Sequence, residues 1–307
     1  MAKIKLPKIE DLFEAGVHFG HQVRRWHPSM EKFIFSHRKG VHIIDLEKTH
    51  ERLEEGTQIL HDVAAEGGQI IFVGTKRQAK EIVKLEAERC GAMFVNERWL
   101  GGTITNYHVI RRNIDKLLDY LRKREAGEFD VYTKKERLLL DRAIDKLTKS
   151  VGGITNLQGA PAALFVVDGR REKTAIREAN RVGLPVVAVV DTNTNISEIP
   201  YVIPGNDDAI RSIAMLVKVV ADAVEAGYSD YAKKVKKTAD DKEAEAKKAA
   251  EEKAKEVEAK KTEAPKVTGS EASHTSKKAG KKHVKKVAKG EEEVKVGKDK
   301  KEKKDSK

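Results

Sequence analysis

The chain has 307 residues, with 61 Lys and Arg against 49 Asp and Glu, a formal net charge of +12, and one cysteine. A single cysteine excludes an intrachain disulfide, and no uninterrupted apolar run approaches the ~20 residues of a membrane span. The N-terminus lacks the apolar core of a signal peptide, so we expect a soluble, cytoplasmic protein with no membrane partner.

The positive charge is unevenly distributed. Residues 229–307 contain 26 Lys and 17 Asp or Glu, which leaves 35 basic and 32 acidic residues in 1–228. The tail therefore holds +9 of the charge and the body only +3. Because the net charge of the body is small, a polyanionic partner is expected to bind the body at local basic patches.

The first predicted elements are a short helix from Asp11 to about Gly16 and a hairpin that pairs residues 33–35 with 41–44. The segment 16–45 is dense in basic and aromatic side chains. Cationic groups neutralise phosphate and flat rings stack on unpaired bases, which favours RNA binding. A solvated basic loop over a few core aromatics is the alternative. The candidate RNA-binding residues here are Arg24, Arg25, Trp26, Lys32, Arg38 and Lys39.

Four histidines share this segment, namely His18, His21, His27 and His37. Their spacing matches no established zinc motif, and the sole cysteine, Cys90, is distant in sequence. We therefore expect surface or capping histidines, no metal and no cofactor.

From Asp45 onward, helical periodicity alternates with short, continuously apolar strands. The strands are predicted at 69–73, 92–95, 163–167, 186–190 and 201–203, with helices between them and a last helix at 207–226. Repeated βα units with strands that are apolar throughout indicate an α/β fold, a Rossmann-like parallel sheet covered on both faces.

Two similar phrases bracket a segment of different periodicity, GGTITN at Gly101–Asn106 and GGITN at Gly152–Asn156. We call these the first and second necks, and expect their Thr and Asn side chains to cap helix starts. Between them, apolar residues at 4-3-4 spacing predict an inserted antiparallel coiled-coil hairpin over 107–151. Its candidate RNA-binding residues are Arg111 and Arg112, against the alternative of a solvated helix face.

Doubly wound folds usually bind ligands beyond the carboxyl ends of their strands. An enzyme acting on a phosphorylated small molecule, through Lys76, Arg77, Asp168 and Asp191, is therefore the alternative function. No strand is followed by a dinucleotide or nucleotide-phosphate glycine motif. Asp168 and Asp191 are expected to cap turns more readily than to ligate a cation.

Residues 229–307 are rich in Lys, Ala and Glu and then in Lys, Gly, Ser and Thr, which predicts a disordered tail that is at most transiently helical at its start. The expected organisation is a sandwich domain (1–106 and 152–228), an inserted hairpin (107–151) and this tail.

A series of distinctive motifs follows one order along the chain: 15–22 (AGVHFGHQ), 33–35 (FIF), 42–49 (HIIDLEKT), 72–77 (FVGTKR), 95–102 (VNERWLGG) and 204–211 (PGNDDAIR). In sequence and in order, these motifs resemble the S-two family of small-subunit ribosomal proteins. The resemblance covers about residues 11–227 and gives no role to the tail.

The resemblance implies a flavodoxin-like sandwich without catalytic activity or homo-oligomers. It also implies binding to 16S ribosomal RNA between the head and body of the subunit, beside other ribosomal proteins, and help in retaining ribosomal protein S-one. With it, the candidate RNA-binding set adds Lys76, Arg77, Arg98 and Trp99 to the residues already named.

Overall fold

The computed structural model describes residues 5–262, with side chains through Thr238. Its centre is a five-stranded parallel sheet in the order β5-β4-β6-β7-β8, the 2-1-3-4-5 order of flavodoxin-like folds. The predicted parallel α/β architecture and its strands are confirmed. The strand bounds are β4 (Ile70–Val73), β5 (Met93–Val95), β6 (Ala163–Val167), β7 (Val186–Val190) and β8 (Tyr201–Pro204).

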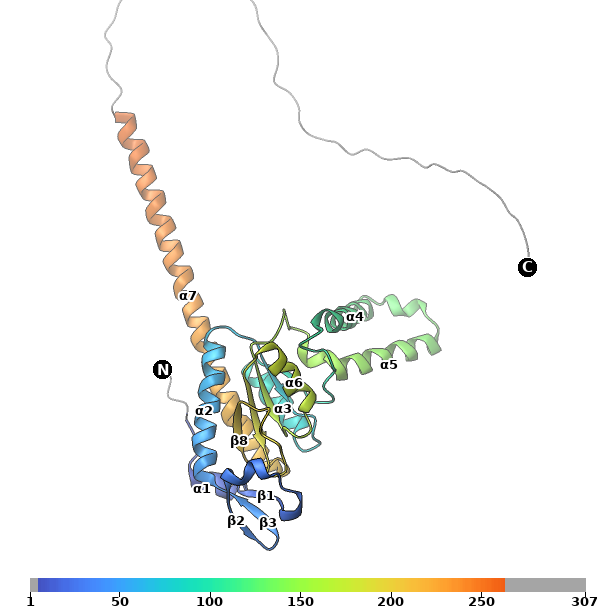
Figure 1. The fold of residues 1–307 in the computed structure, drawn as a ribbon. Coiled ribbons are helices and arrows are strands. Elements are labelled where there is room, and N and C mark those ends of the chain that lie inside the picture. The colour runs from blue at the N-terminus through green and yellow to red at the C-terminus, as the bar shows by residue number, and fades with distance from the viewer. Residues whose placement is uncertain (1–4, 263–307) are drawn as a thin grey trace, which may run out of the picture. The chain divides into compact units, whose positions relative to one another are not determined.

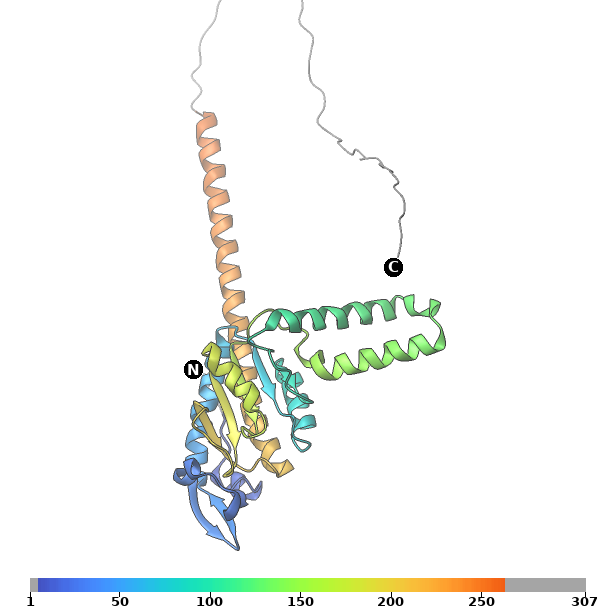
Figure 2. The same cartoon turned by 45° about the vertical axis from the view of Figure 1, so that its right-hand side comes forward.

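Helices cover both faces of this sheet (Figures 1 and 2) because its inner strands are buried on both sides. On one face, Leu60 of α2, Val83 of α3 and Val217 of α7 share a core with Phe72 and other strand side chains. On the other face, α6 packs over the sheet. The bounds are α2 (Leu46–Ala65), α3 (Lys80–Cys90), α6 (Lys173–Val182) and α7 (Ile210–Thr262).

A three-stranded antiparallel sheet in the order β1-β3-β2, the N-terminal sheet, precedes α2. The predicted hairpin of β2 and β3 is confirmed, and β1 was missed because its four residues carry no apolar alternation. Lys39 and Gly40 both have positive φ, 51° and 79°, as a two-residue type I′ turn requires. The elements are α1 (Ile9–Glu14), β1 (Phe19–Gln22), η1 (Val23–Arg25), η2 (Pro28–Phe33), β2 (Ile34–Arg38) and β3 (Val41–Ile44).

The segment between the necks is a pair of antiparallel helices, α4 (Tyr107–Glu125) and α5 (Lys134–Val151), joined through the short helix η3 (Glu128–Val131) (Figure 2). Buried residues at the base of the pair, such as Ile110 and Val151, belong to the same core as the sheet. The base of the hairpin is therefore packed against the sandwich. Supercoiling of the two helices as a coiled coil stays a prediction.

The last helix, α7, runs on to Thr262, well beyond the predicted end at 226. The segment 229–262, predicted as the start of a disordered tail, is helical because Ala, Glu and Lys, its commonest residues, are strong helix formers. The rest of the predicted tail, 263–307, lies outside the described residues. Within the described part of the chain, no helix has the length and apolarity needed to cross a bilayer.

Candidate nucleic-acid interface

The N-terminal sheet and the short helices beside it carry five exposed basic side chains. Within residues 5–238, none of the five forms an ion pair, and Arg24 Nε donates only to Gln22 Oε1, at 3.0 Å. Their positive charge is therefore free to meet an external anion. The five are Arg24 and Arg25 on η1, Lys32 on η2, and Arg38 and Lys39 at the β2–β3 turn.

Backbone hydrogen bonds hold this segment against the sandwich. The His27 amide donates to Thr192 O at 2.8 Å, and the Asp45 amide donates to Phe33 O at 2.9 Å. Met30 and Phe33 are buried in the core between these bonds. The basic side chains thus extend from a fixed backbone, which lowers the entropy lost when they bind a partner.

The two tryptophans have different surroundings. Trp26 is half-buried beside His42, with ring centroids 5.4 Å apart, and keeps part of its surface in solvent. Trp99 is only 6% exposed, and its Nε1 donates to Glu178 Oε1 at 3.2 Å. Trp99 is therefore placed for packing, and of the two rings only that of Trp26 has surface to offer a base.

Glu178 of α6 organises the first neck, and no sequence motif indicated it. Its carboxylate accepts from the Gly102 amide at 2.7 Å and the Ile104 amide at 3.1 Å, besides Trp99. Burial raises the pKa of Glu178, but these hydrogen bonds outweigh it, so the pKa lies below the usual value. The predicted cap from Asn106 is wrong, since its side chain makes no capping hydrogen bond.

The second neck lies close to β5. A Cβ on Gly153 would come within 2.2 Å of Phe94 O, so only glycine fits there. Tyr107 Oη and Arg111 Nη1 both donate to Leu157 O, the latter at 3.2 Å. Arg111 is thus partly engaged in fastening the hairpin base, whereas Arg112 is exposed and forms no ion pair among the described residues.

Lys76, a predicted phosphate contact, lies among carboxylates of the protein itself, and its contact with RNA stays a prediction. Its Nζ lies 2.7 Å from Asp207 Oδ1, 2.6 Å from Asp208 Oδ1 and 3.9 Å from Asp168 Oδ2, and its side chain is 14% exposed. Burial lowers the pKa of Lys76, but its hydrogen bonds to Asp207 and Asp208 raise it overall. The neighbouring Arg77 is exposed and unpaired within the described residues.

The carboxylates around Lys76 form an acidic cluster with His21 of β1. His21 Nδ1 lies 2.8 Å from Asp191 Oδ2, and this hydrogen bond raises the pKa of the imidazole. Asp207 is 1% exposed, and its burial, together with the charges of Asp168 and Asp191, raises its pKa although Lys76 lowers it. The cluster is therefore short of positive charge.

The protein's own side chains also occupy the switch point between β4 and β6, where flavodoxin-like folds bind ligands. Thr75 Oγ1 donates to Glu172 and accepts from Arg171 Nε at 2.8 Å. Asp168 Oδ1 accepts from the Arg170 and Arg171 amides, at 3.1 and 3.0 Å, so its predicted capping role is confirmed. Because the protein's own side chains fill this switch point, the structure does not favour the enzyme alternative.

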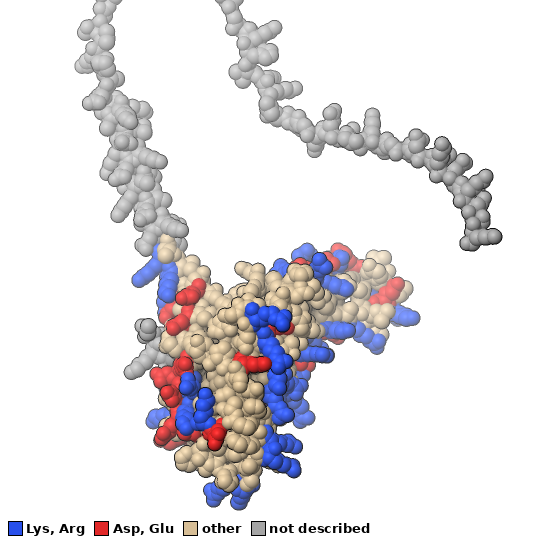
Figure 3. All heavy atoms as spheres, viewed as in Figure 1, with Lys and Arg blue, Asp and Glu red and all other residues tan. Residues whose placement is uncertain are grey.

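Sequence reasoning missed a second basic group on and before α6. Arg170, Lys173 and Arg181 are exposed and form no ion pair among the described residues, whereas Arg177 pairs with Glu198. In Figure 3, Lys and Arg gather along this side of the sandwich and onto the hairpin, while basic and acidic side chains mix on the side of α2. The sequence signal that could have revealed this group is the recurrence of basic residues on and just before one predicted helix.

A comparison with protein-family models agrees with these features. The model described as Ribosomal protein S2 matches residues 12–227, which include both sheets, both necks and the hairpin. That family is structural and non-enzymatic, and it belongs to the small ribosomal subunit. With well over half of its length matched, the chain is a member of the ribosomal protein S2 family.

Proposed function

We propose that this protein binds 16S ribosomal RNA between the head and body of the small subunit, as a single copy on cytoplasmic ribosomes. The observation that carries the proposal is the set of five basic side chains on the N-terminal sheet and its short helices, which have no ion pair within residues 5–238 and are held by a backbone bonded to the sandwich. The proposed phosphate contacts are Arg24, Arg25, Lys32, Arg38, Lys39, Arg77, Arg98 and Arg112, with Trp26 as a stacking surface.

Placement matters more than the count of charges. Each phosphate contact or stacked base held in position contributes on the order of 1–3 kcal/mol. A flexible lysine offers only screened attraction that falls steeply with salt. Arg24 and Arg25 lie next to Trp26 on a short helix, so they combine two phosphate contacts with one ring.

The test is competitive incorporation of full-length variants into small subunits, read by mass spectrometry. Arg24→Ala with Arg25→Ala should lower incorporation at least about tenfold, the loss expected for one or two contacts. The matched control is Arg52→Ala with Arg177→Ala, which removes the same charge from side chains paired with Glu55 and Glu198. Equal losses for both variants would mean that only bulk charge matters and would contradict the proposal.

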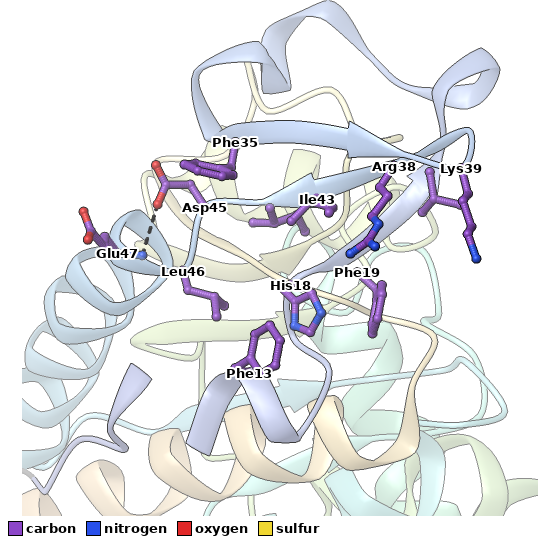
Figure 4. A pocket seen from close by; sticks show the side chains of 12 residues that line it. Phe13, His18, Phe19, Phe35, Arg38, Lys39, Ile43, Asp45, Leu46 and Glu47 are labelled. Carbon is purple, nitrogen blue, oxygen red and sulfur yellow. Dashed lines mark hydrogen bonds between the residues drawn. The ribbon is translucent and has the colours of Figure 1, made fainter. Parts of the chain in front are cut away.

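A second part of the proposal is that the protein helps to retain ribosomal protein S-one, and an apolar cavity supports it. The cavity of about 750 Å³ lies between α1, the start of α2 and the N-terminal sheet (Figure 4). Phe13, Phe19 and Phe35 line it with 60%, 51% and 75% of their surface exposed. Exposed apolar surface of this kind is typical of protein-binding sites.

Phe35→Ser should lower the amount of S-one that stays on purified small subunits, because it removes the most exposed ring of the cavity. Leu85→Ser is the control, since Leu85 is 63% exposed on α3 and lies outside the cavity. If the Phe35 variant retains as much S-one as the control does, the cavity is not needed for retaining S-one.

A further inference from the structure

The apolar cavity beside the N-terminal sheet has a floor of three stacked rings. Phe13 and His18 are nearly parallel, with ring centroids 4.3 Å apart and an interplanar angle of 9°. Phe19 lies on the other side of His18, with ring centroids 4.0 Å apart (Figure 4). Phe35 stands across the cavity from this floor. A planar molecule that enters the cavity therefore meets aromatic surface on two sides.

Backbone hydrogen bonds hold this floor in place. The Ile44 amide of β3 donates to His18 O at 2.8 Å, and the Asn206 amide donates to Val17 O at 3.1 Å. The loop that carries His18 is thus tied to the N-terminal sheet and to the sandwich. The cavity volume of about 750 Å³ lies within the range of roughly 300–1,000 Å³ that is typical of small-molecule sites. A ligand would find the site already formed, so little loss of entropy opposes its binding.

The floor carries no charge of its own. His18 is 7% exposed, and its Nδ1 is buried without a hydrogen bond among the described residues. Burial lowers the pKa of this imidazole, so the ring is neutral at pH 7. An unpartnered buried nitrogen costs free energy, and a polar atom of a ligand that reaches it would remove this cost. The floor therefore suits an aromatic ring better than a charged group.

The two ends of the cavity differ in charge (Figure 4). Arg38 and Lys39 lie at one end, exposed and without an ion pair within residues 5–238. At the other end, the Asp45 carboxylate accepts from the Glu47 amide at 3.1 Å and pairs with Lys48 Nζ at 3.2 Å. Only Glu47 leaves an unpaired negative charge there. With two unpaired positive charges against one negative charge, the cavity favours an anionic ligand.

We propose that this cavity binds a planar aromatic compound with one acidic group, such as an aromatic carboxylate, sulfonate or phosphate. Its rings would lie between Phe35 and the floor, and its acidic group would contact Arg38. A guanidinium group binds carboxylate and phosphate oxygens through paired hydrogen bonds. The bound compound would cover the rings that are proposed to hold S-one, so ligands of this class would compete with S-one. The site itself rests on neither part of the proposed function.

The experiment uses the free full-length protein and two fluorescent probes of similar shape. One is anilinonaphthalene sulfonate (ANS), an aromatic anion, and the other is the uncharged N-phenylnaphthylamine (NPN), which lacks the sulfonate. Both probes become brighter when they pass from water into an apolar site. Physiological ionic strength screens weak attraction of ANS to surface lysines. Wild-type protein should bind one molecule of ANS per chain, counted by fluorescence titration and by calorimetry.

Two substitutions test the two parts of the site separately. Phe35→Ser removes the most exposed ring of the cavity and should lower the affinity for both probes at least about tenfold. Arg38→Ala should lower the affinity for ANS about fivefold, as for an exposed ion pair, and leave the affinity for NPN unchanged. The matched controls are Leu85→Ser on α3 and Arg24→Ala on η1, both exposed and outside the cavity. Both controls should bind the two probes as the wild type does.

Phe13→Ser tests the same site from another element, α1, where Phe13 is 60% exposed. It should weaken both probes as Phe35→Ser does. Each variant should still unfold cooperatively in urea, because the substituted side chains are exposed.

Two results would overturn the site. One is wild-type affinity for ANS in either phenylalanine variant. The other is an equal loss of ANS affinity in the Arg38 and Arg24 variants, which would mean that the probe responds only to bulk charge. Both results are measured on the free protein, without RNA or S-one. Failure of this site is therefore distinguishable from failure of RNA binding or of S-one retention.

Discussion

The N-terminal sheet and the carboxyl edge of the parallel sheet are both rich in charged side chains, but they use them differently. On the N-terminal sheet and the short helix η1 beside it, Arg24, Arg25 and Lys39 are exposed and unpaired within the described residues. At the carboxyl edge, Lys76 lies among three carboxylates. At the edge where this fold usually binds ligands, the lysine is paired inside the protein, whereas the small N-terminal sheet and the short helices beside it present free positive charge.

This difference shows that a basic residue next to a strand end is ambiguous until its neighbours are known. Lys76 and Arg77 are adjacent in sequence, yet one is paired inside the protein and the other is exposed. Burial beside carboxylates converts a potential phosphate ligand into a structural ion pair.

The largest effect is expected from Lys76→Ala, which leaves Asp207 and Asp208 without their counter-ion. The free energy of unfolding measured with urea should fall on the order of 3 kcal/mol. Lys80→Ala, which breaks the exposed pair with Glu97, should cost less than about 1 kcal/mol. Unchanged stability with weakened RNA binding would instead make Lys76 a phosphate ligand and erase the contrast between the two regions.

Glu178→Gln should have the next largest effect, because the neutral amide is a poorer acceptor for the amides of the first neck. We expect a loss of about 2 kcal/mol at pH 7, as for hydrogen bonds to a charged group. The folded pKa of Glu178 is lowered, so its carboxylate stabilises the protein above the unfolded pKa.

That contribution is lost as the pH falls through the folded pKa. The difference between wild type and Glu178→Gln in urea unfolding should therefore be full at pH 6 and shrink below about pH 4.3. A difference that stays constant down to pH 3 would show that shape, rather than charge, holds the neck.

A smaller effect is expected at the tip of the N-terminal sheet. Lys39 has φ 51°, a conformation that glycine adopts without strain, so Lys39→Gly should stabilise the protein by at most about 1 kcal/mol. Incorporation into small subunits should fall nonetheless, since the variant loses a phosphate contact. A variant that is both more stable and better incorporated would show that rigidity of the turn matters more than its charge.

The smallest effect on incorporation is expected from removing residues 263–307. This segment contains 15 Lys and 8 acidic residues, so its charge of +7 should strengthen non-specific RNA binding and steepen its salt dependence. Cutting after Thr262 keeps α7 intact, including Tyr228, whose hydroxyl accepts from the Ile70 amide at 3.2 Å. Filter binding at several salt concentrations measures the loss of non-specific RNA binding, and the incorporation assay measures entry into small subunits.

Local patterns in the sequence determined the fold class, the five strands and the two helices between the necks. Strands such as Val186–Val190 appear at their predicted bounds because a continuous run of β-branched residues is a local signal that burial on two faces reinforces. The motifs from Ala15 to Arg211 likewise identified the family, because their residues and their order can be read directly from the sequence.

Only the tertiary structure decided which charges are free and which are paired. Lys76 and Asp207 are 131 residues apart, His21 and Asp191 are 170 apart, and Glu178 lies 76 residues from Gly102. No periodicity or spacing connects such positions. The first two contacts arise at the edge where parallel strands bring their carboxyl ends together, and the third arises where α6 packs beside the first neck. The buried cluster around Lys76 and the anchored first neck are therefore properties of the folded chain alone.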